Sequence, residues 1–337
     1  MDTLSRGRRP ALGGEARGGL AARLREPTSV VFLALFGLIA VGWVLVALDG
    51  GQFLTTESIV GIQQRSAALG IVAIGQTLAI LAGSLDLSVA YLISLTSLVA
   101  AEIMAGQDGN ILPAVAAVLA VSALVGLVNG LVITRLHVHA FIATLGVALI
   151  IRGIVDHLYD GPAGKVPESF QLLGYSRIGP IPVSALLWAG VAVVAWFLLS
   201  RTRLGYRVYA VGGNEEVARL SGIRTSRVIV LTHVLCSICA GVAGLLLASR
   251  LGAGAPTVGT DGGYDLESIA AVVLGGTALA GGKGGVAGTV GGVLLLAVLD
   301  TIFNQLEVNS FVKDVVRGVV IVIAVAVYAR RIKGRSA

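Results

Sequence analysis

The sequence predicts an all-α membrane protein with about ten transmembrane helices, some of them broken or re-entrant, and a short cytoplasmic helix. Three observations predict this fold class. Of the 337 residues, 55% are hydrophobic and only 13% are charged, about half the charged share of a soluble domain. Several apolar runs reach the length of about 20 residues that crosses a bilayer. Glycine occurs 46 times, which suits both close helix packing in lipid and interrupted helices. This composition excludes a soluble domain and a disordered chain.

The apolar runs predict the spans one after another along the chain. The first run, 29–48, follows a basic segment and exceeds the hydrophobic part of a signal peptide, which takes about 7–15 residues. The pattern is least regular at 89–106 and at the pair 264–281 and 285–306, because glycines interrupt it. The predicted spans are 29–48, 59–82, 89–106, 111–134, 139–158, 182–199, 228–250, 264–281, 285–306 and 312–329.

Basic residues predict the orientation of these spans. Residues 1–28 and 200–227 hold six arginines each, and 329–337 hold four basic residues. Cytoplasmic loops carry an excess of Lys and Arg, and ten spans place all three segments on that side, with both termini. The net charge of +6 is therefore an orientation signal and does not indicate nucleic-acid binding. We expect a basic N-terminal segment 1–28, one transmembrane domain 29–329 with a cytoplasmic loop 200–227, and a basic tail 330–337.

Motifs of enzymes and nucleotide sites are incomplete in this chain. The run 281–284 resembles a phosphate loop, but Thr277 stands in place of its first glycine and Gly284 in place of its Ser or Thr. The four histidines lie at separate span ends and form no ligand set. Cys236 and Cys239 lie at helical spacing in an apolar run, which indicates two small residues of one membrane helix and not a redox pair. The sequence predicts no catalytic residue, no metal site and no cofactor.

One short helix is predicted within the 200–227 loop. Asn214 is a good N-cap, and Glu215 and Glu216 lie at the positive end of the helix dipole. Glu215 and Arg219 have the spacing of a helical ion pair, and Gly222 suits a left-handed C-terminal turn. Such a short helix is marginal unless it docks. The pattern leaves open an ordinary ordered loop or a helix that docks into a partner's groove.

A break in the apolar pattern lies at 82–88. An acidic residue between two apolar runs is costly at membrane depth unless it is satisfied, and Asp86 or Ser88 can cap the following helix. Gln76 and Thr77 add hydrogen-bonding groups in the run before it. The break is compatible with a solvated turn at the membrane face. It is equally compatible with the end of a half-helix lining a translocation pathway, for which Gln76, Thr77, Asp86, Ser88 and Asn129 are the candidates.

Glycine spacing predicts close helix packing at two places. Gly126 and Gly130 flank Asn129 in a GxxxG pattern, so we expect this face to pack against another helix with one hydrogen bond. Arg152, near the middle of 139–158, must face a neighbour or a cavity, or extend its charged end to the interface. A second stripe of helix-packing glycines comprises Gly284, Gly288 and Gly292.

Five segments together resemble one family of membrane proteins. They are 75–89, 126–136, 141–153, 212–223 and 256–292, in the order in which that family carries them. On these segments the chain resembles the permease subunit of ribose-type ABC sugar importers, in the superfamily of branched-chain amino acid and monosaccharide permeases. The resemblance runs from about 67 to 326. Ser84 and Ala90 stand where the family more often has glycine, and Ala140 where it has proline.

The resemblance implies the partners and the localisation. It implies a second permease copy, forming a homodimer or a heterodimer, a cytoplasmic ATPase subunit that uses ATP and magnesium, and an extracytoplasmic sugar-binding protein that meets outside loops such as 251–263. It places the chain in a bacterial cytoplasmic membrane. It also makes the 212–223 segment the coupling helix that meets the ATPase, through Gly212, Gly213, Asn214, Glu215, Glu216, Ala218, Arg219, Leu220 and Gly222.

Other functions remain open from the sequence. An ABC permease for nucleosides or branched-chain amino acids shares most of these features. A stand-alone secondary transporter needs ionisable residues within its spans, and here they are few: Asp86, Glu102, Arg152, Asp300 and Arg317. A membrane enzyme lacks a catalytic constellation.

Overall fold

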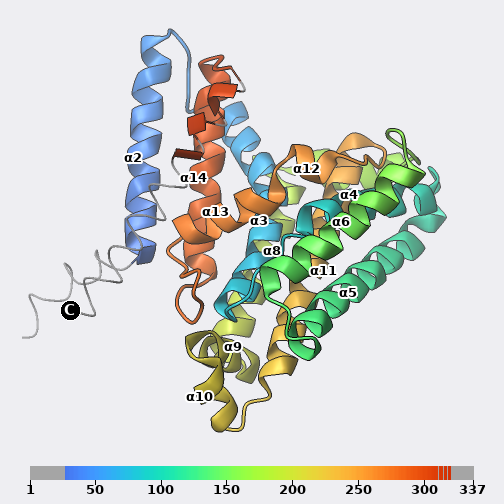
Figure 1. The fold of residues 1–337 in the computed structure, drawn as a ribbon. Coiled ribbons are helices and arrows are strands. Elements are labelled where there is room, and N and C mark those ends of the chain that lie inside the picture. The colour runs from blue at the N-terminus through green and yellow to red at the C-terminus, as the bar shows by residue number, and fades with distance from the viewer. Residues whose placement is uncertain (1–26, 310, 314, 317, 320–337) are drawn as a thin grey trace, which may run out of the picture.

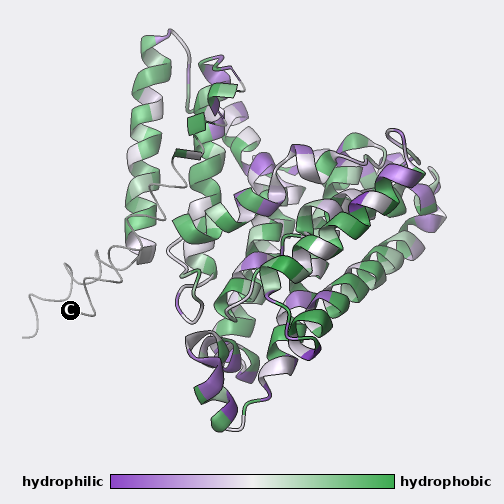
Figure 2. Cartoon of the chain, in the orientation of Figure 1, coloured by the Kyte–Doolittle hydropathy of each residue, from purple (hydrophilic) through white to green (hydrophobic). Residues whose placement is uncertain are grey.

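The computed structural model describes residues 27–319 except 310, 314 and 317, and shows a bundle of helices (Figure 1). Within these residues, two strands of two residues each form one hairpin. Hydrophobic residues make up most of the long helices, and hydrophilic residues gather at the helix ends and on α10 (Figure 2). The elements are α2 (Pro27–Leu48), α3 (Thr56–Leu81), α4 (Val89–Met104), η1 (Asp108–Asn110), α5 (Ile111–Arg135), α6 (Ala140–Leu158), α7 (Glu168–Tyr175), β1 (Arg177–Ile178), β2 (Ile181–Pro182), α8 (Val183–Arg201), α9 (Arg203–Gly213), α10 (Glu215–Leu220), α11 (Thr225–Leu251), α12 (Val258–Asp261), α13 (Tyr264–Leu274) and α14 (Val286–Gln305).

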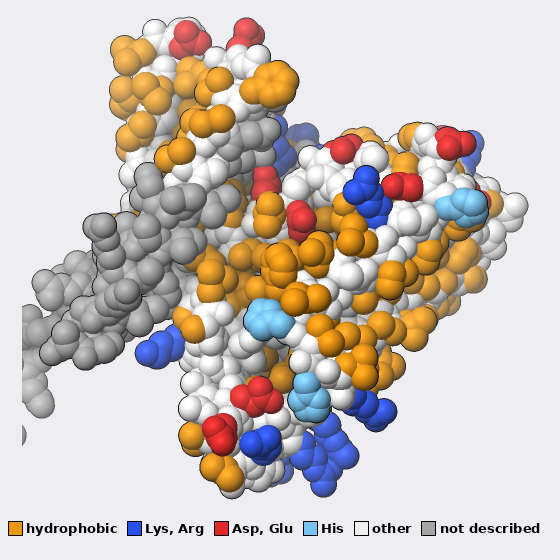
Figure 3. Space-filling view, in the orientation of Figure 1, with side chains coloured by type: hydrophobic (Ala, Val, Ile, Leu, Met, Phe, Trp, Pro, Cys, Tyr) orange, Lys and Arg blue, Asp and Glu red, His pale blue; other side chains and the backbone are white. Residues whose placement is uncertain are grey.

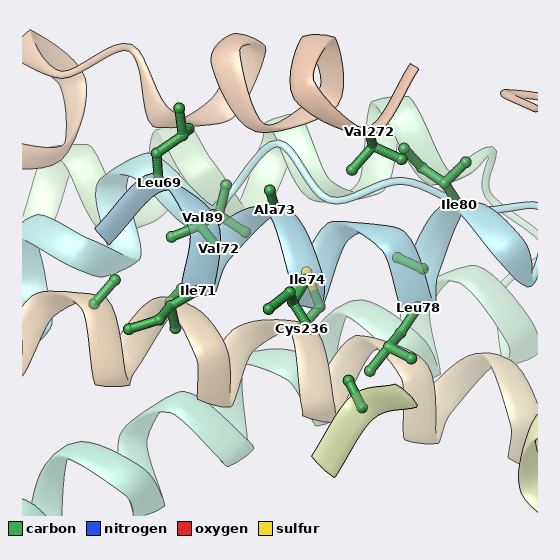
Figure 4. Packing of buried hydrophobic residues seen from close by; sticks show 14 of the residues in the cluster. Leu69, Ile71, Val72, Ala73, Ile74, Leu78, Ile80, Val89, Cys236 and Val272 are labelled. Carbon is green, nitrogen blue, oxygen red and sulfur yellow. The ribbon is translucent and has the colours of Figure 1, made fainter. Parts of the chain in front are cut away.

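Two long helices, α3 and α11, form the centre of the molecule. The Thr55 hydroxyl caps α3 by accepting from the Ser58 amide at 3.1 Å. All residues of α3 from 66 to 81 are buried, so protein surrounds this half of the helix on every side. α11 packs against α3, α4 and α5. Figure 4 shows the interlocking apolar side chains, with Ile71 and Ile74 of α3 beside Cys236 of α11.

Small residues allow the central helices to approach closely. A Cβ atom added at Gly75 would lie 3.0 Å from the Cα atom of Cys236. At Gly241 and Gly244 of α11, an added Cβ would overlap the hydroxyl groups of Ser122 and Thr96. Close approach without a large side chain is how helices pack in lipid, where burial from water supplies no drive. Glycines therefore lie where these central helices cross most closely.

The helical membrane fold is as predicted, but the count of ten spans is not reached. Within the described residues, seven helices are long and apolar enough to cross a membrane, namely α2, α3, α5 with the preceding η1, α6, α8, α11 and α14. α4 is a shorter apolar helix of 16 residues. The predicted span 312–329 falls largely outside the described residues.

One predicted span is wrong in its length. The run 264–281 contains a helix of 11 residues, α13, that ends at Leu274. The chain then turns through Gly275 and Gly276, and Gly276 adopts a φ of 83°, where glycine is favoured. An added Cβ at Gly275 would overlap the backbone of Gly288 in α14, so the two helices touch at this turn. The glycines that interrupt the sequence pattern therefore end α13 after 11 residues.

The two long loops carry their own structure. The 159–181 segment contains α7 and the strand β1, which pairs with β2 to form a hairpin. The 200–227 segment contains α9 and α10, where the sequence predicted a single helix of about two turns. α9 and α10 lie at one end of the bundle, near the loop between α13 and α14 (Figure 1).

Candidate functional site

The short helix α10 is closed at both ends and presents most of its side chains to solvent. Asn214 caps it by accepting from the Val217 amide at 3.0 Å. At the other end, the Ile223 amide donates to the Ala218 carbonyl at 3.0 Å, and Gly222 adopts a φ of 82°. Val217 is 57% and Leu220 is 80% exposed, beside the exposed charges of Glu215, Glu216 and Arg219. This mixed apolar and charged surface suits docking to another protein.

Gly212 and Gly213 do not belong to α10, contrary to the single 212–223 coupling helix that we predicted. They are the last residues of α9, and the extended backbone of Asn214, with a φ of −163°, separates the two helices. The two glycines also differ from each other. A Cβ added at Gly212 would overlap the carbonyl oxygen of Leu81, whereas nothing lies within 4 Å of one added at Gly213. Gly212 is therefore a close-contact position and Gly213 is not.

Backbone contacts join the end of α9 to the break between α3 and α4 and to the turn between α13 and α14. We call this place the glycine junction (Gly83, Gly212, Gly281 and Gly282). The Gly282 amide donates to the Leu81 carbonyl at 3.0 Å. A Cβ added at Gly281 would lie 2.8 Å from the carbonyl oxygen of Gly212 and 2.9 Å from the Cα atom of Gly83. Because no side chain separates these segments, the end of α9 is in direct backbone contact with the end of α3 and with the α13–α14 turn.

Tyr209 of α9 adds a second link to the same turn. Its hydroxyl donates to the Gly284 carbonyl at 2.9 Å. Burial raises the pKa of Tyr209, which keeps the phenol protonated and able to donate. The amphipathic helix α9 thus holds the turn both by its last residues and by this side chain.

The second glycine stripe lies between α13 and α14. An added Cβ at Gly288 would overlap the Gly275 carbonyl, and one at Gly292 would overlap the Ala271 carbonyl. Gly284 lies in the turn before α14, at a φ of 130° and close to Thr277. Gly288 and Gly292 therefore lie where α14 crosses α13, while Gly284 shapes the turn.

The 82–88 break is held by a buried polar network, the Asp86 cluster (Ser84, Asp86, Ser88, Asn129, His233 and Ser237). Asp86 Oδ1 accepts from the Ser88 amide at 2.9 Å and from the Ser88 hydroxyl at 2.6 Å. The Asn129 amide group donates to both carboxylate oxygens, at 3.3 and 3.2 Å. All six side chains are buried. A buried carboxylate is tolerated when donors surround it in this way.

His233 of α11 completes the cluster. Its Nδ1 lies 3.4 Å from Asp86 Oδ2, and its Nε2 lies 2.8 Å from the Ser84 hydroxyl. The imidazole thus bridges two residues of the break, and the Thr144 hydroxyl of α6 accepts from the Leu87 amide at 3.1 Å. Side chains from α5, α6 and α11 therefore converge on the break, which is buried from 86 to 88 and exposed at Gly83.

The sequence did not point to His233 or Ser84. The spacing of the four histidines shows only that they form no metal-ligand set, and it does not distinguish His233 from the other three. A histidine within an apolar run needs a buried hydrogen-bond partner, and so does an acid such as Asp86 between two apolar runs. Considering these two residues as a pair is the signal that could have identified the contact. No group of three potential metal ligands occurs among the described residues.

The GxxxG face of α5 lies directly beside this cluster. A Cβ added at Gly126 would lie 2.6 Å from the His233 carbonyl oxygen, and one at Gly130 would lie 2.6 Å from the Cα atom of Val230. α5 and α11 are therefore in backbone contact on both sides of Asn129, which brings its amide group within reach of Asp86.

Gln76 and Thr77 lie on the buried part of α3. Thr77 shares a hydrogen bond of 2.7 Å with Thr289 of α14, and Gln76 Oε1 accepts from the Cys236 thiol at 3.4 Å. The Nε2 atom of Gln76 has no hydrogen-bond partner among the described residues. All five residues that we predicted to line a pathway are buried inside the chain, so their pathway role stays a prediction.

Together, these features define a class of protein. Glycine-interrupted helices within an apolar bundle are a feature of multi-pass membrane transport proteins. The chain belongs to the family described as branched-chain amino acid transport system / permease component, whose model matches residues 58–325. It is therefore a transport permease subunit and not an enzyme.

Relatives with assigned functions are similar over most of their length. The ribose import permease of Escherichia coli strain K12 is 42% identical over 311 residues, which cover 91% of this chain and 94% of the relative. The ribose import permease of Bacillus subtilis strain 168 is 40% identical over 300 residues, covering 87% and 90%. The L-arabinose transport system permease of Escherichia coli strain K12 is 35% identical over 297 residues, covering 88% of each chain. No solved structure matches.

Proposed function

We propose that this chain is the transmembrane permease subunit of an ABC importer that carries a monosaccharide, such as ribose, or a related sugar or polyol. The observation that carries the proposal is the 42% identity to a ribose import permease over 91% of the chain. Relatives named for D-allose and L-arabinose support the same substrate class. The family description also names branched-chain amino acids, which makes these the second candidate substrate.

Energy for import comes from a partner ATPase that binds ATP and magnesium on the cytoplasmic side. We infer that it docks on α10, since this helix exposes Val217 and Leu220 beside three charged side chains. The permease itself binds no cofactor and makes no covalent bond. It supplies the path and transmits force from the ATPase to the membrane helices.

The assembly contains two permease copies and an extracytoplasmic sugar-binding protein. A homodimer is the simplest form, and a heterodimer with a related permease is an alternative. The chain lies in a bacterial cytoplasmic membrane, with the 1–28 segment, the 200–227 loop and the 330–337 tail in the cytoplasm. The 251–263 segment faces the binding protein.

Two mechanical routes lead from α10 into the membrane region. The first passes through Asn214 into α9 and the glycine junction, where Gly212 touches Leu81 and Gly282. The second passes through 221–224 into α11, where His233 Nε2 lies 2.8 Å from the Ser84 hydroxyl of the α3–α4 break. A cavity of about 780 Å³ separates α10 from the break and gives the helix room to move. ATP-driven closure of the partner would thus reorient both helix breaks together.

Reconstitution of the complete transporter in proteoliposomes tests the proposal. We expect labelled ribose uptake that requires ATP, the ATPase and a sugar-loaded binding protein, and no uptake of leucine or of a nucleoside. Charge reversal in α10, as Glu215→Lys with Arg219→Glu, abolishes uptake while the permease still inserts in the membrane. Arg201→Glu, at the end of α8, is the matched control and retains uptake. Uptake without ATP would indicate a secondary transporter, and normal uptake by the reversed variant would contradict the coupling role.

A further inference from the structure

An ion pair lies exposed on α6, a helix that is otherwise apolar enough to cross the membrane. Arg152 Nε and Asp156 Oδ2 are 3.2 Å apart, and the two side chains are 56% and 59% exposed. At a rise of about 1.5 Å per residue, Arg152 lies about 9 Å from the C-terminal end of the helix. Neighbouring acidic and basic side chains are visible over α6, among hydrophobic ones (Figure 3). A charge this close to a helix end either extends to the membrane interface or faces a partner or water.

The pair occupies one side of α6 only. The helix packs against α4 and α5 through a single buried stripe of Ala143, Thr144, Ala148, Ile151 and Val155. Arg152 and Asp156 lie on the flank of this stripe that meets Tyr91 of α4, a residue that interacts with the guanidinium. On the opposite flank, Ile150 and Ile154 are 63% and 47% exposed and apolar. Lipid suits the isoleucine flank. The flank of Arg152 and Asp156 also exposes Leu145 and Leu149, so its polar side chains are confined to the C-terminal part of α6.

We propose that the charged flank of α6 faces the translocation path and that Arg152, Asp156 and Tyr91 contact the hydroxyl groups of the transported solute. This inference rests on the proposed sugar importer. A sugar hydroxyl both donates and accepts, and the guanidinium offers donors, the carboxylate offers acceptors and the phenol offers both. The pair carries no net charge, which favours a neutral polyhydroxylated solute over an ion. The Tyr91 ring adds an apolar surface for the C–H face of the sugar.

The experiment measures labelled sugar imported per ATP hydrolysed, in proteoliposomes with the ATPase and a saturating sugar-loaded binding protein. Arg152→Gln and Asp156→Asn each lower this ratio about tenfold, the effect of losing one charged hydrogen bond, while stimulated ATP hydrolysis stays near the wild-type rate. Asp156→Glu, which keeps the acceptor, restores part of the ratio. Arg201→Gln removes an arginine outside the flank and leaves the ratio unchanged.

Two results would overturn the inference. If both variants retain the wild-type ratio, the pair faces lipid and its charges extend to the interface. If uptake and ATP hydrolysis fall together and the permease elutes as a single copy in size-exclusion chromatography, the pair belongs to the contact between two permease copies. Failure of the wild-type complex to import sugar would instead contradict the proposed function.

Discussion

Asp86 on one side, and Arg152 with Asp156 on the other, are charged residues of the membrane helices and their breaks that are built in opposite ways. Asp86 is fully buried and is hydrogen-bonded to residues of its own break, of α5 and of α11. Arg152 and Asp156 are exposed, and the hydrogen bond that joins them is made along a single helix. A charge surrounded by partners holds a fold together, whereas an exposed pair is available to something that binds from outside. We therefore expect the first group to control stability and the second to control transport.

Removal of the Asp86 carboxylate has the largest expected effect on stability. Asp86→Ala leaves His233 and Asn129 without their shared acceptor, and breaking a buried pair on one side costs about 3–5 kcal/mol. We expect a large fall in the unfolding temperature of the purified permease in detergent. Asp86→Asn keeps the shape and one acceptor, and lowers the temperature less. Equal unfolding temperatures for Asp86→Ala and the wild type would show that the cluster does not hold the break.

A substitution in the glycine junction has the next largest expected effect on stability, and the adjacent Gly213 provides a matched control. Gly212→Ala forces a methyl group into the Leu81 carbonyl, and overpacking of this kind costs about 1–3 kcal/mol. Gly213→Ala adds the same methyl group where nothing lies within 4 Å. We expect uptake and unfolding temperature to fall in the first variant and to stay near wild type in the second. Identical behaviour of the two variants would argue against direct backbone contact at the junction.

Loss of the α10 cap has a smaller and more local effect. Asn214→Ala removes the side chain that accepts from the Val217 amide, at a cost of about 1 kcal/mol. Because α10 is exposed and short, this frays the helix without unfolding the bundle. We expect weaker binding of the ATPase, measured by co-purification, at an unchanged unfolding temperature. Asn214→Ser keeps a cap and should restore binding, and failure of this rescue would assign another role to Asn214.

The smallest effect on stability is expected at the exposed pair. Arg152→Gln leaves the packing stripe of α6 intact, and exposed ion pairs contribute little to folding. Its unfolding temperature in detergent should match that of the wild type. A fall as large as that of Asp86→Ala would remove the distinction between the two groups.

The sequence predicted what depends on composition and on local pattern. Charge and hydropathy gave the helical membrane class, because lipid requires apolar side chains and internally bonded backbone. Capping chemistry located α10, since Asn214, Glu215 and Gly222 carry that information within a few residues. The GxxxG pattern marked the side of α5 that lies against α11.

Features that depend on distant residues were not predictable. The Asp86–His233 contact joins residues 147 positions apart, and nothing local in the sequence pairs them. The early end of α13 results from glycines that pattern analysis treats as ordinary small residues of a longer span. Gly212 looked like part of the coupling helix, and only its contacts with Leu81 and Gly282 assign it to the junction.

The most direct test of the difference between the two groups compares Asp86→Asn and Arg152→Gln in one experiment. For both variants, the unfolding temperature in detergent and the sugar imported per ATP hydrolysed are measured against the wild type. We predict that Asp86→Asn lowers the unfolding temperature, while the molecules that remain folded import as much sugar per ATP as the wild type. Arg152→Gln leaves the unfolding temperature unchanged and lowers the sugar imported per ATP. The reverse pattern, or the same loss of both quantities in both variants, would contradict the division between a structural buried charge and an exposed charge that meets the solute.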